Sequence, residues 1–75
     1  MLPYRDWDRD SNVAAYDIGN GYIDVRFKTG AIYRYTASSA GQWNLSEMIR
    51  LARVGDGLNR FINRVVRKGY AARLS

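Results

Sequence analysis

The sequence predicts an α+β fold in which a three-stranded antiparallel β-meander is followed by two C-terminal helices packed on one sheet face, in the order β-β-β-α-α. Apolar residues alternate with polar ones in the first half of the chain, which is typical of strands with one buried face. In the second half they recur every three or four residues, as in amphipathic helices. A chain of 75 residues is long enough for one small domain.

Three segments carry the strand pattern. Residues 12–18 form the first, and the sequence Gly-Asn-Gly that follows is a strong turn signal. Residues 22–28 form the second, with Ile23, Val25 and Phe27 on one face. The opposite face of this second strand carries Tyr22, Asp24, Arg26 and Lys28. Residues 31–36 form the third strand.

Gly30 sets the register between the second and third strands. A glycine at this position suits a three-residue loop, in which a type I turn is followed by a left-handed residue and a bulge. Tyr33 and Tyr35 then join the apolar face, whereas Arg34 faces the other way. A two-residue loop would bury Arg34, which is costly for an unpaired charge. The predicted pairs are Phe27–Ala31, Val25–Tyr33, Ile23–Tyr35, Arg26–Ile32 and Asp24–Arg34.

Two apolar stripes after the loop at residues 38–41 predict two helices. The first stripe contains Leu45, Met48, Ile49 and Ala52, and the second contains Leu58, Phe61, Ile62, Val65 and Val66. Asp56 is the predicted N-cap of the second helix, and Gly69 is predicted to end it. The predicted core contains Val25, Phe27, Tyr33, Tyr35, Met48, Ile49, Leu58, Phe61, Ile62 and Val65.

Residues 1–10 are charged and aperiodic, and we interpret them as a polar leader before a single domain of residues 11–75. Two alternatives stay open for the leader: it is disordered, or it packs one aromatic side chain onto the domain. Its aspartates imitate the start of a calcium loop, but Ser11 stands where that loop needs a glycine. No metal site is therefore predicted.

The chain contains neither cysteine nor histidine. Disulfides and thiolate zinc sites are thereby excluded, and the commonest general base is absent. The serines have no histidine to activate them, and both lysines are expected to be exposed. We therefore predict a protein that is not an enzyme and that uses no cofactor.

The N-terminus lacks the basic and apolar regions of a signal peptide. No segment approaches the roughly 18 continuous apolar residues of a membrane-spanning helix. Together with the absence of cysteine, these features predict a cytoplasmic protein.

Positive charge is concentrated in the second part of the chain. Residues 1–24 hold two arginines and five aspartates, whereas residues 25–75 hold ten cations and two acids. Ten of the twelve cations are arginine, the residue best suited to bidentate contacts with phosphate. The distribution favours an anionic partner.

Several short motifs together resemble a known family. They are Ser11-Asn12-Val13, Tyr16-Asp17, Val25-x-Phe27-x-x-Gly30-x-x-Tyr33-x-Tyr35, Ala52, Gly57-Leu58-Asn59 and Phe61-Ile62. Over residues 11–70 the chain resembles the KTSC domain, a small module found at the C-terminus of some lysyl-tRNA synthetases and alone in bacterial proteins. The resemblance implies the fold given above and, because RNA binding has been suggested for the family, an RNA partner. Many members place Val-Pro soon after Tyr-x-Tyr, whereas this chain has Thr36-Ala37, so the path into the first helix is expected to differ.

Two surfaces are candidate binding sites, and for each an ordinary solvated face stays the alternative. The first, on the open sheet face, consists of Tyr22, Arg26, Lys28 and Arg34. It places an aromatic ring among cations, as do sheets that bind single strands. The second, on the second helix, consists of Arg60, Arg64 and Arg67, extended by Lys68. A phosphate backbone could follow that ridge.

The first functional hypothesis is a non-enzymatic module that binds nucleic acid, above all tRNA-like or single-stranded RNA. The second is a protein-interaction or structural module whose basic face meets an acidic protein. A membrane partner is not predicted, because the basic helix face shows no bulky apolar residue. An exposed sheet edge would allow a homodimer. Tyr33 and Tyr35 are assigned to the core rather than to base stacking.

Overall fold

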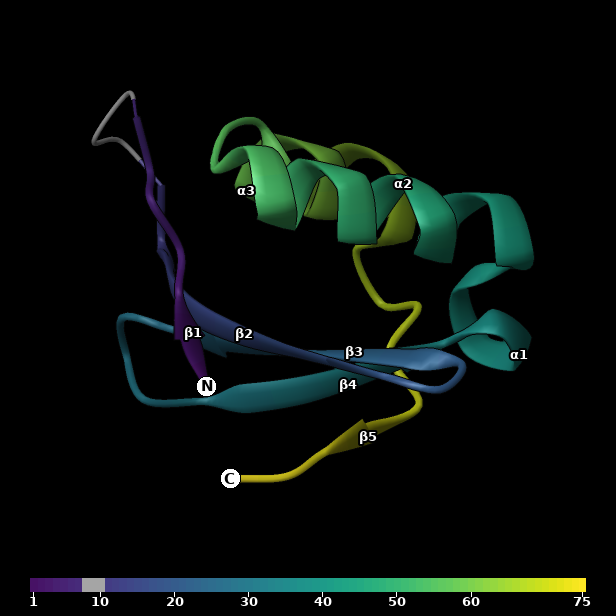
Figure 1. The fold of residues 1–75 in the computed structure, drawn as a ribbon. Helices are drawn as coiled ribbons and strands as arrows, with labels where there is room; N and C mark the ends of the chain where they lie inside the picture. The colour runs from purple at the N-terminus through teal and green to yellow at the C-terminus, as the bar shows by residue number, and fades with distance from the viewer. Residues whose placement is uncertain (8–10) are drawn as a thin grey trace.

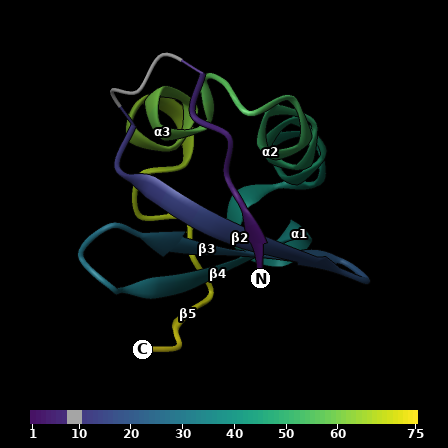
Figure 2. The same ribbon diagram turned by 60° about the vertical axis from the view of Figure 1, so that its left-hand side comes forward.

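The computed structural model describes residues 1–7 and 11–75, and within them five antiparallel strands form one sheet. In both chain and sheet order the strands are β1 (Leu2–Pro3), β2 (Val13–Gly19), β3 (Tyr22–Phe27), β4 (Ile32–Thr36) and β5 (Ala72–Arg73). The helices are α1 (Ala37–Ala40), α2 (Gln42–Val54) and α3 (Leu58–Phe61), which continues into the π-helical turn η1 (Ile62–Val66). The layer of α2, α3 and η1 lies over one face of the sheet (Figure 1 and Figure 2).

The α+β class is confirmed, but the prediction of three strands followed by two helices is wrong. β1 and β5 flank the predicted meander as its edge strands, and β5 follows the helices. Each is only two residues long and pairs with a distant part of the chain, Leu2 with Tyr16 and Arg73 with Tyr33. A two-residue strand is too short to show an alternating pattern, so periodicity could not reveal it.

The register of the central hairpin is confirmed. Val25 lies opposite Tyr33, and Asp24 lies opposite Arg34. The amide of Phe27 donates to the carbonyl of Ala31 at 2.9 Å, which closes the three-residue loop. Gly30 has a φ of +96°, the left-handed conformation that this loop needs at its last position. Tyr33 and Tyr35 consequently lie on the sheet face that the helices cover.

The core sits between the sheet and the helices. Its buried apolar residues are Tyr4, Val13, Tyr16, Ile23, Val25, Tyr35, Leu45, Met48, Ala52, Leu58, Ile62 and Val66. The remaining predicted core residues Phe27, Tyr33, Ile49 and Phe61 are half-buried and pack against this cluster. Val65, however, is 51% exposed, and Val66 is buried in its place. The prediction for Val65 is wrong because a π turn holds more than four residues, which rotates the apolar stripe by one position.

The ends of the helices differ in part from the prediction. The additional helix α1 begins with a capping box, in which Thr36 and Ser39 exchange side-chain and backbone hydrogen bonds. The N-cap of α3 is Gly57, and no side chain caps it, so the assignment of Asp56 is wrong. The helical segment ends at Val66, whose carbonyl accepts from the amide of Gly69.

The leader packs onto the domain through an aromatic residue, one of its two predicted alternatives. Tyr4 is buried, and its hydroxyl accepts a hydrogen bond from the amide of Leu58 at 3.1 Å. This bond satisfies a donor at the uncapped start of α3. Asp8 and Asp10 of the calcium-loop imitation lie outside the described residues. Among the described residues no group of three acidic side chains could hold a metal ion.

Candidate nucleic-acid interface

The structure divides the predicted site residues between two sides of the molecule. Tyr22, Arg26 and Arg34 belong to β3 and β4. They alternate with the buried residues of these strands, so they project from the face that the helices do not cover. Arg60 and Arg64 lie in α3 and η1, on the opposite side of the sheet (Figure 2). The two sets therefore cannot form one continuous site.

On the open sheet face, Arg34 is held by neighbouring side chains. Its Nε and Nη2 atoms donate to the two carboxylate oxygens of Asp24 at 2.8 and 2.9 Å. The hydrogen bond to Asp24 raises the pKa of Arg34, and the guanidinium is charged at every physiological pH. Asp24 itself is only 6% exposed. A bidentate pair of this kind leaves Arg34 few donors for a ligand.

Tyr22 is also engaged within the open face. The guanidinium carbon of Arg34 lies 4.0 Å from the centre of the Tyr22 ring, a close cation–π contact. Gly19 lies directly opposite Tyr22 in β2, and a β-carbon at position 19 would overlap the ring. The ring is therefore packed between the β2 backbone and Arg34, and the residue is only partly exposed to solvent. Of the residues predicted for this face, Arg26 is exposed, and Lys28 is exposed but its ammonium group contacts Asp6, which lines the cleft described next.

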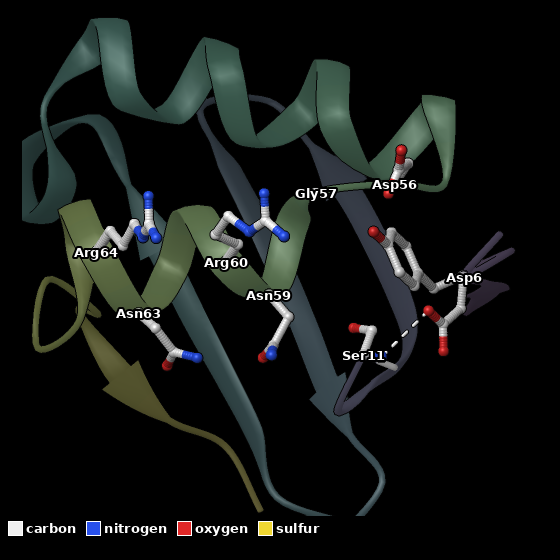
Figure 3. A pocket seen from close by; sticks show the side chains of 9 residues that line it. Asp6, Ser11, Asp56, Gly57, Asn59, Arg60, Asn63 and Arg64 are labelled. Atoms are coloured by element: carbon white, nitrogen blue, oxygen red, sulfur yellow. Dashed lines mark hydrogen bonds between the residues drawn. The ribbon is translucent and has the colours of Figure 1, made fainter. Parts of the chain in front are cut away.

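On the helical side, a polar cleft runs beside α3 and η1 (Figure 3). We call it the α3 cleft; its volume is about 410 Å³. Its lining residues are Tyr4, Asp6, Ser11, Asp56, Gly57, Asn59, Arg60, Asn63 and Arg64. Arg60 and Arg64 extend from one side of the helix, and Asn59 and Asn63 extend from another (Figure 3). Arg67 and Lys68 are exposed after the end of the helix and do not line the cleft.

Helical spacing explains why these side chains lie in rows. Side chains four positions apart are neighbours on a helix surface and project in nearly the same direction. Asn63 therefore follows Asn59, and Arg64 follows Arg60, along the helix surface. Within the described residues, none of the four makes a side-chain hydrogen bond or ion pair with the protein. Each row thus presents hydrogen-bonding groups that no side chain in the described part of the chain occupies.

The acidic end of the α3 cleft is partly neutralised. Asp6 accepts from the amide of Ser11 at 3.2 Å and from Nζ of Lys28 at 3.2 Å. Asp56 remains exposed beside the start of α3. An anion in this cleft is therefore expected nearer to Arg64, away from Asp56.

A second cavity of about 350 Å³ adjoins the cleft at the two asparagines. It is lined by Asn12, Phe27, Thr29, Ala31, Tyr33, Asn59 and Asn63. The amides of Asn59 and Asn63 therefore stand between a charged cavity and one with two aromatic rings. Such amides can donate to and accept from the edge of a nucleobase.

Sequence reasoning did not identify the most exposed large apolar side chain among the described residues. Trp43, in the first turn of α2, is 70% exposed. Its position was a usable signal, because Trp43 precedes Leu45 by two residues and so falls outside the buried stripe of its helix. Val65 lies exposed on the neighbouring helical segment. The expectation that the basic helix face lacks bulky apolar residues is thus incorrect at Val65.

No helix among the described residues is long and apolar enough to span a membrane. No protein-family model, curated protein or solved structure matches this chain. The resemblance to the KTSC domain therefore stays a prediction.

Proposed function

We propose that this protein is a non-enzymatic module that binds nucleic acid, RNA in the first place, through Arg60 and Arg64. The observation that carries the proposal is that these two arginines stand side by side on the α3 cleft and have no partner among residues 1–7 and 11–75. A phosphodiester backbone offers anionic oxygens to which guanidinium groups bind bidentately. Arg67 and Lys68 would add positive charge beyond the end of η1.

The surroundings of the two arginines support the same function. Asn59 and Asn63 place amide groups in the same cleft as the two arginines that are predicted to contact phosphate. Phosphate contacts position a nucleic acid, and contacts to base edges can then select a sequence. The resemblance to the KTSC domain points in the same direction. The contribution of Tyr22 and Arg34 is expected to be minor, because each already contacts the other.

Fluorescence anisotropy with tRNA and with single-stranded oligomers, over a salt series, tests the proposal. We expect affinity tighter than about 100 μM at low salt, weakening as salt rises. Arg60→Ala/Arg64→Ala should weaken binding at least about tenfold. It should also reduce the slope of log K against log salt by about 1.4 on single strands.

The matched control is Arg26→Ala/Arg53→Ala, which removes the same charge from exposed positions outside the α3 cleft. If both double variants weaken binding equally, net charge and not the cleft is responsible. No binding at low salt would refute the proposal. Co-purification of an acidic protein without nucleic acid would then favour a protein partner.

A further inference from the structure

Trp43 presents an indole ring that the protein barely uses. The residue is 70% exposed, the largest exposed fraction among the large apolar side chains described. Within the described residues, its indole N–H donates no hydrogen bond. Its only ring neighbour there is Phe61, with ring centres 6.4 Å apart. Most of the ring surface is therefore in contact with solvent.

Trp7 shows that exposure alone does not make a tryptophan available. It is 63% exposed, but its indole N–H donates to the carbonyl of Val54 at 2.9 Å. The guanidinium carbon of Arg5 also lies 5.6 Å from the centre of its ring. The polar atom of Trp7 is satisfied within the protein, and its ring has a cation beside it. Trp43 has neither kind of contact among the described residues.

Trp43 adjoins the helical segment that carries the free arginines. Phe61, its neighbour, lies in α3 between Arg60 and the first residue of η1. Phe61 directly follows Arg60, and Arg64 lies in the next turn of the same helical segment. Through Phe61, Trp43 therefore contacts the helical segment that carries the arginines of the α3 cleft.

The acidic residue nearest to Trp43 along α2 is already neutralised. Glu47 lies one turn after Trp43 and accepts hydrogen bonds from the guanidinium of Arg50, from Nε at 3.1 Å. The bonds from Arg50 lower the pKa of Glu47, so this carboxylate stays ionised but compensated. An anionic ligand on Trp43 would therefore meet little repulsion from α2.

We propose that Trp43 is a stacking platform for one base of a single-stranded nucleic acid whose backbone contacts Arg60 and Arg64. The inference rests on the proposed function and narrows it to single strands. In a duplex both faces of a base are covered by its neighbours, so an indole can stack only on a base that is free. A base on Trp43 would cover exposed indole surface while its phosphate met the free guanidinium groups.

Intrinsic fluorescence separates the two tryptophans. The variant Trp7→Phe retains Trp43 as its fluorophore, and Trp43→Phe retains Trp7. Titration with a short oligouridylate should quench Trp7→Phe to saturation and leave Trp43→Phe nearly unchanged. A duplex of matched length should quench neither protein strongly.

Anisotropy with the same labelled oligouridylate measures the contribution of the ring. Trp43→Ala should weaken binding about tenfold, and Trp43→Phe, which keeps an aromatic face, should weaken it less. Val54→Ala is the matched control, because it removes an exposed apolar side chain at the far end of α2. Circular dichroism verifies that each variant is folded.

The outcomes separate this inference from the proposed function. Oligomer binding that is unchanged in Trp43→Ala, or equal affinity for duplex and single strand, overturns the stacking platform but leaves nucleic-acid binding intact. If neither the parent protein nor Arg60→Ala/Arg64→Ala binds the oligomer, both the stacking platform and the proposed nucleic-acid binding are overturned. A Trp43 signal that responds to anionic lipid vesicles and not to the oligomer also overturns the inference.

Discussion

The open sheet face and the α3 cleft both carry a pair of strand or helix arginines, but Arg34 on the sheet is held by neighbouring side chains, whereas Arg60 and Arg64 in the cleft have no partner among the described residues. Arg34 in β4 forms two hydrogen bonds with Asp24 and covers the ring of Tyr22. Arg60 and Arg64 make no such contacts with the described residues. The difference teaches that the number of cations on a surface does not give the number available to a ligand.

The sequence spacing explains the contrast. Asp24 and Arg34 lie directly opposite in neighbouring strands, where side chains of opposite charge meet. On a helix the corresponding neighbours lie three and four positions away. For Arg64 these neighbours are Arg60, Phe61, Arg67 and Lys68, none of which is acidic. Strand pairing thus supplies a partner for Arg34, and the helix supplies none for Arg64.

The largest expected effect comes from the removal of Asp24, the side chain that holds Arg34 on the open sheet face. Asp24→Ala leaves Arg34 without its carboxylate on a half-covered surface, so we expect a clear fall in the urea midpoint of unfolding. Affinity for nucleic acid should not fall. Asp17→Ala is the control, because Asp17 faces Asp24 across β2 and β3, and its loss relieves a like-charge contact. A gain in stability of Asp24→Ala over the parent would contradict the role given to this pair.

Between pH 10 and 12 the stability of the fold is expected to fall while the arginines keep their charge. Burial raises the pKa of Tyr35 to about 12, so its hydroxyl keeps its proton to higher pH in the folded state than in the unfolded state. This contribution to stability is fully present below pH 10 and is lost as the pH rises from about 10 through 12. The loss is roughly 2–3 kcal/mol, whereas the arginines stay charged over most of that range.

Urea unfolding at several pH values, with Tyr35→Phe as the control, measures this effect. The variant lacks the hydroxyl and should lose less stability between pH 10 and 12 than the parent. An identical loss in the two proteins would show that other groups account for alkaline unfolding. Tyrosinate absorbance in the folded protein reports the titration directly.

The smallest expected effect concerns the acidic end of the α3 cleft. Lys28→Ala removes the exposed partner of Asp6, and its effect on stability should stay within about 0.5 kcal/mol. Because Asp6 then bears an uncompensated charge near Arg60, binding of nucleic acid should weaken by less than about threefold. Lys28→Arg should restore the parent affinity. A large loss in Lys28→Ala would instead place the lysine itself in contact with the ligand.

The central hairpin could be predicted because its determinants are local. Gly30 fixes the length of the loop, and the alternation of Ile23, Val25 and Phe27 then fixes which side chains face the helices. The position of Arg34 beside Asp24 follows from the same register. Local pattern also identified the main stripe of α2.

The parts that could not be predicted depend on distant contacts. Leu2 is in a strand because β2 lies beside it, and Tyr4 is buried in the core, where its hydroxyl meets the start of α3. Val66 is buried where Val65 was expected because the helix ends in a π turn, which periodicity in the sequence does not reveal. Similarly, only the structure shows that Tyr22 is covered and Trp43 is not.

An NMR titration with a short single-stranded RNA tests most directly whether the α3 cleft, rather than the open sheet face, is the binding site. The account predicts that the largest amide shifts fall in residues 59–67, accompanied by the indole N–H of Trp43. Amides of β3 and β4 around Tyr22 and Arg34 should change little. Shifts centred on Tyr22, Arg26 and Arg34, with the helical segment unaffected, would contradict the account.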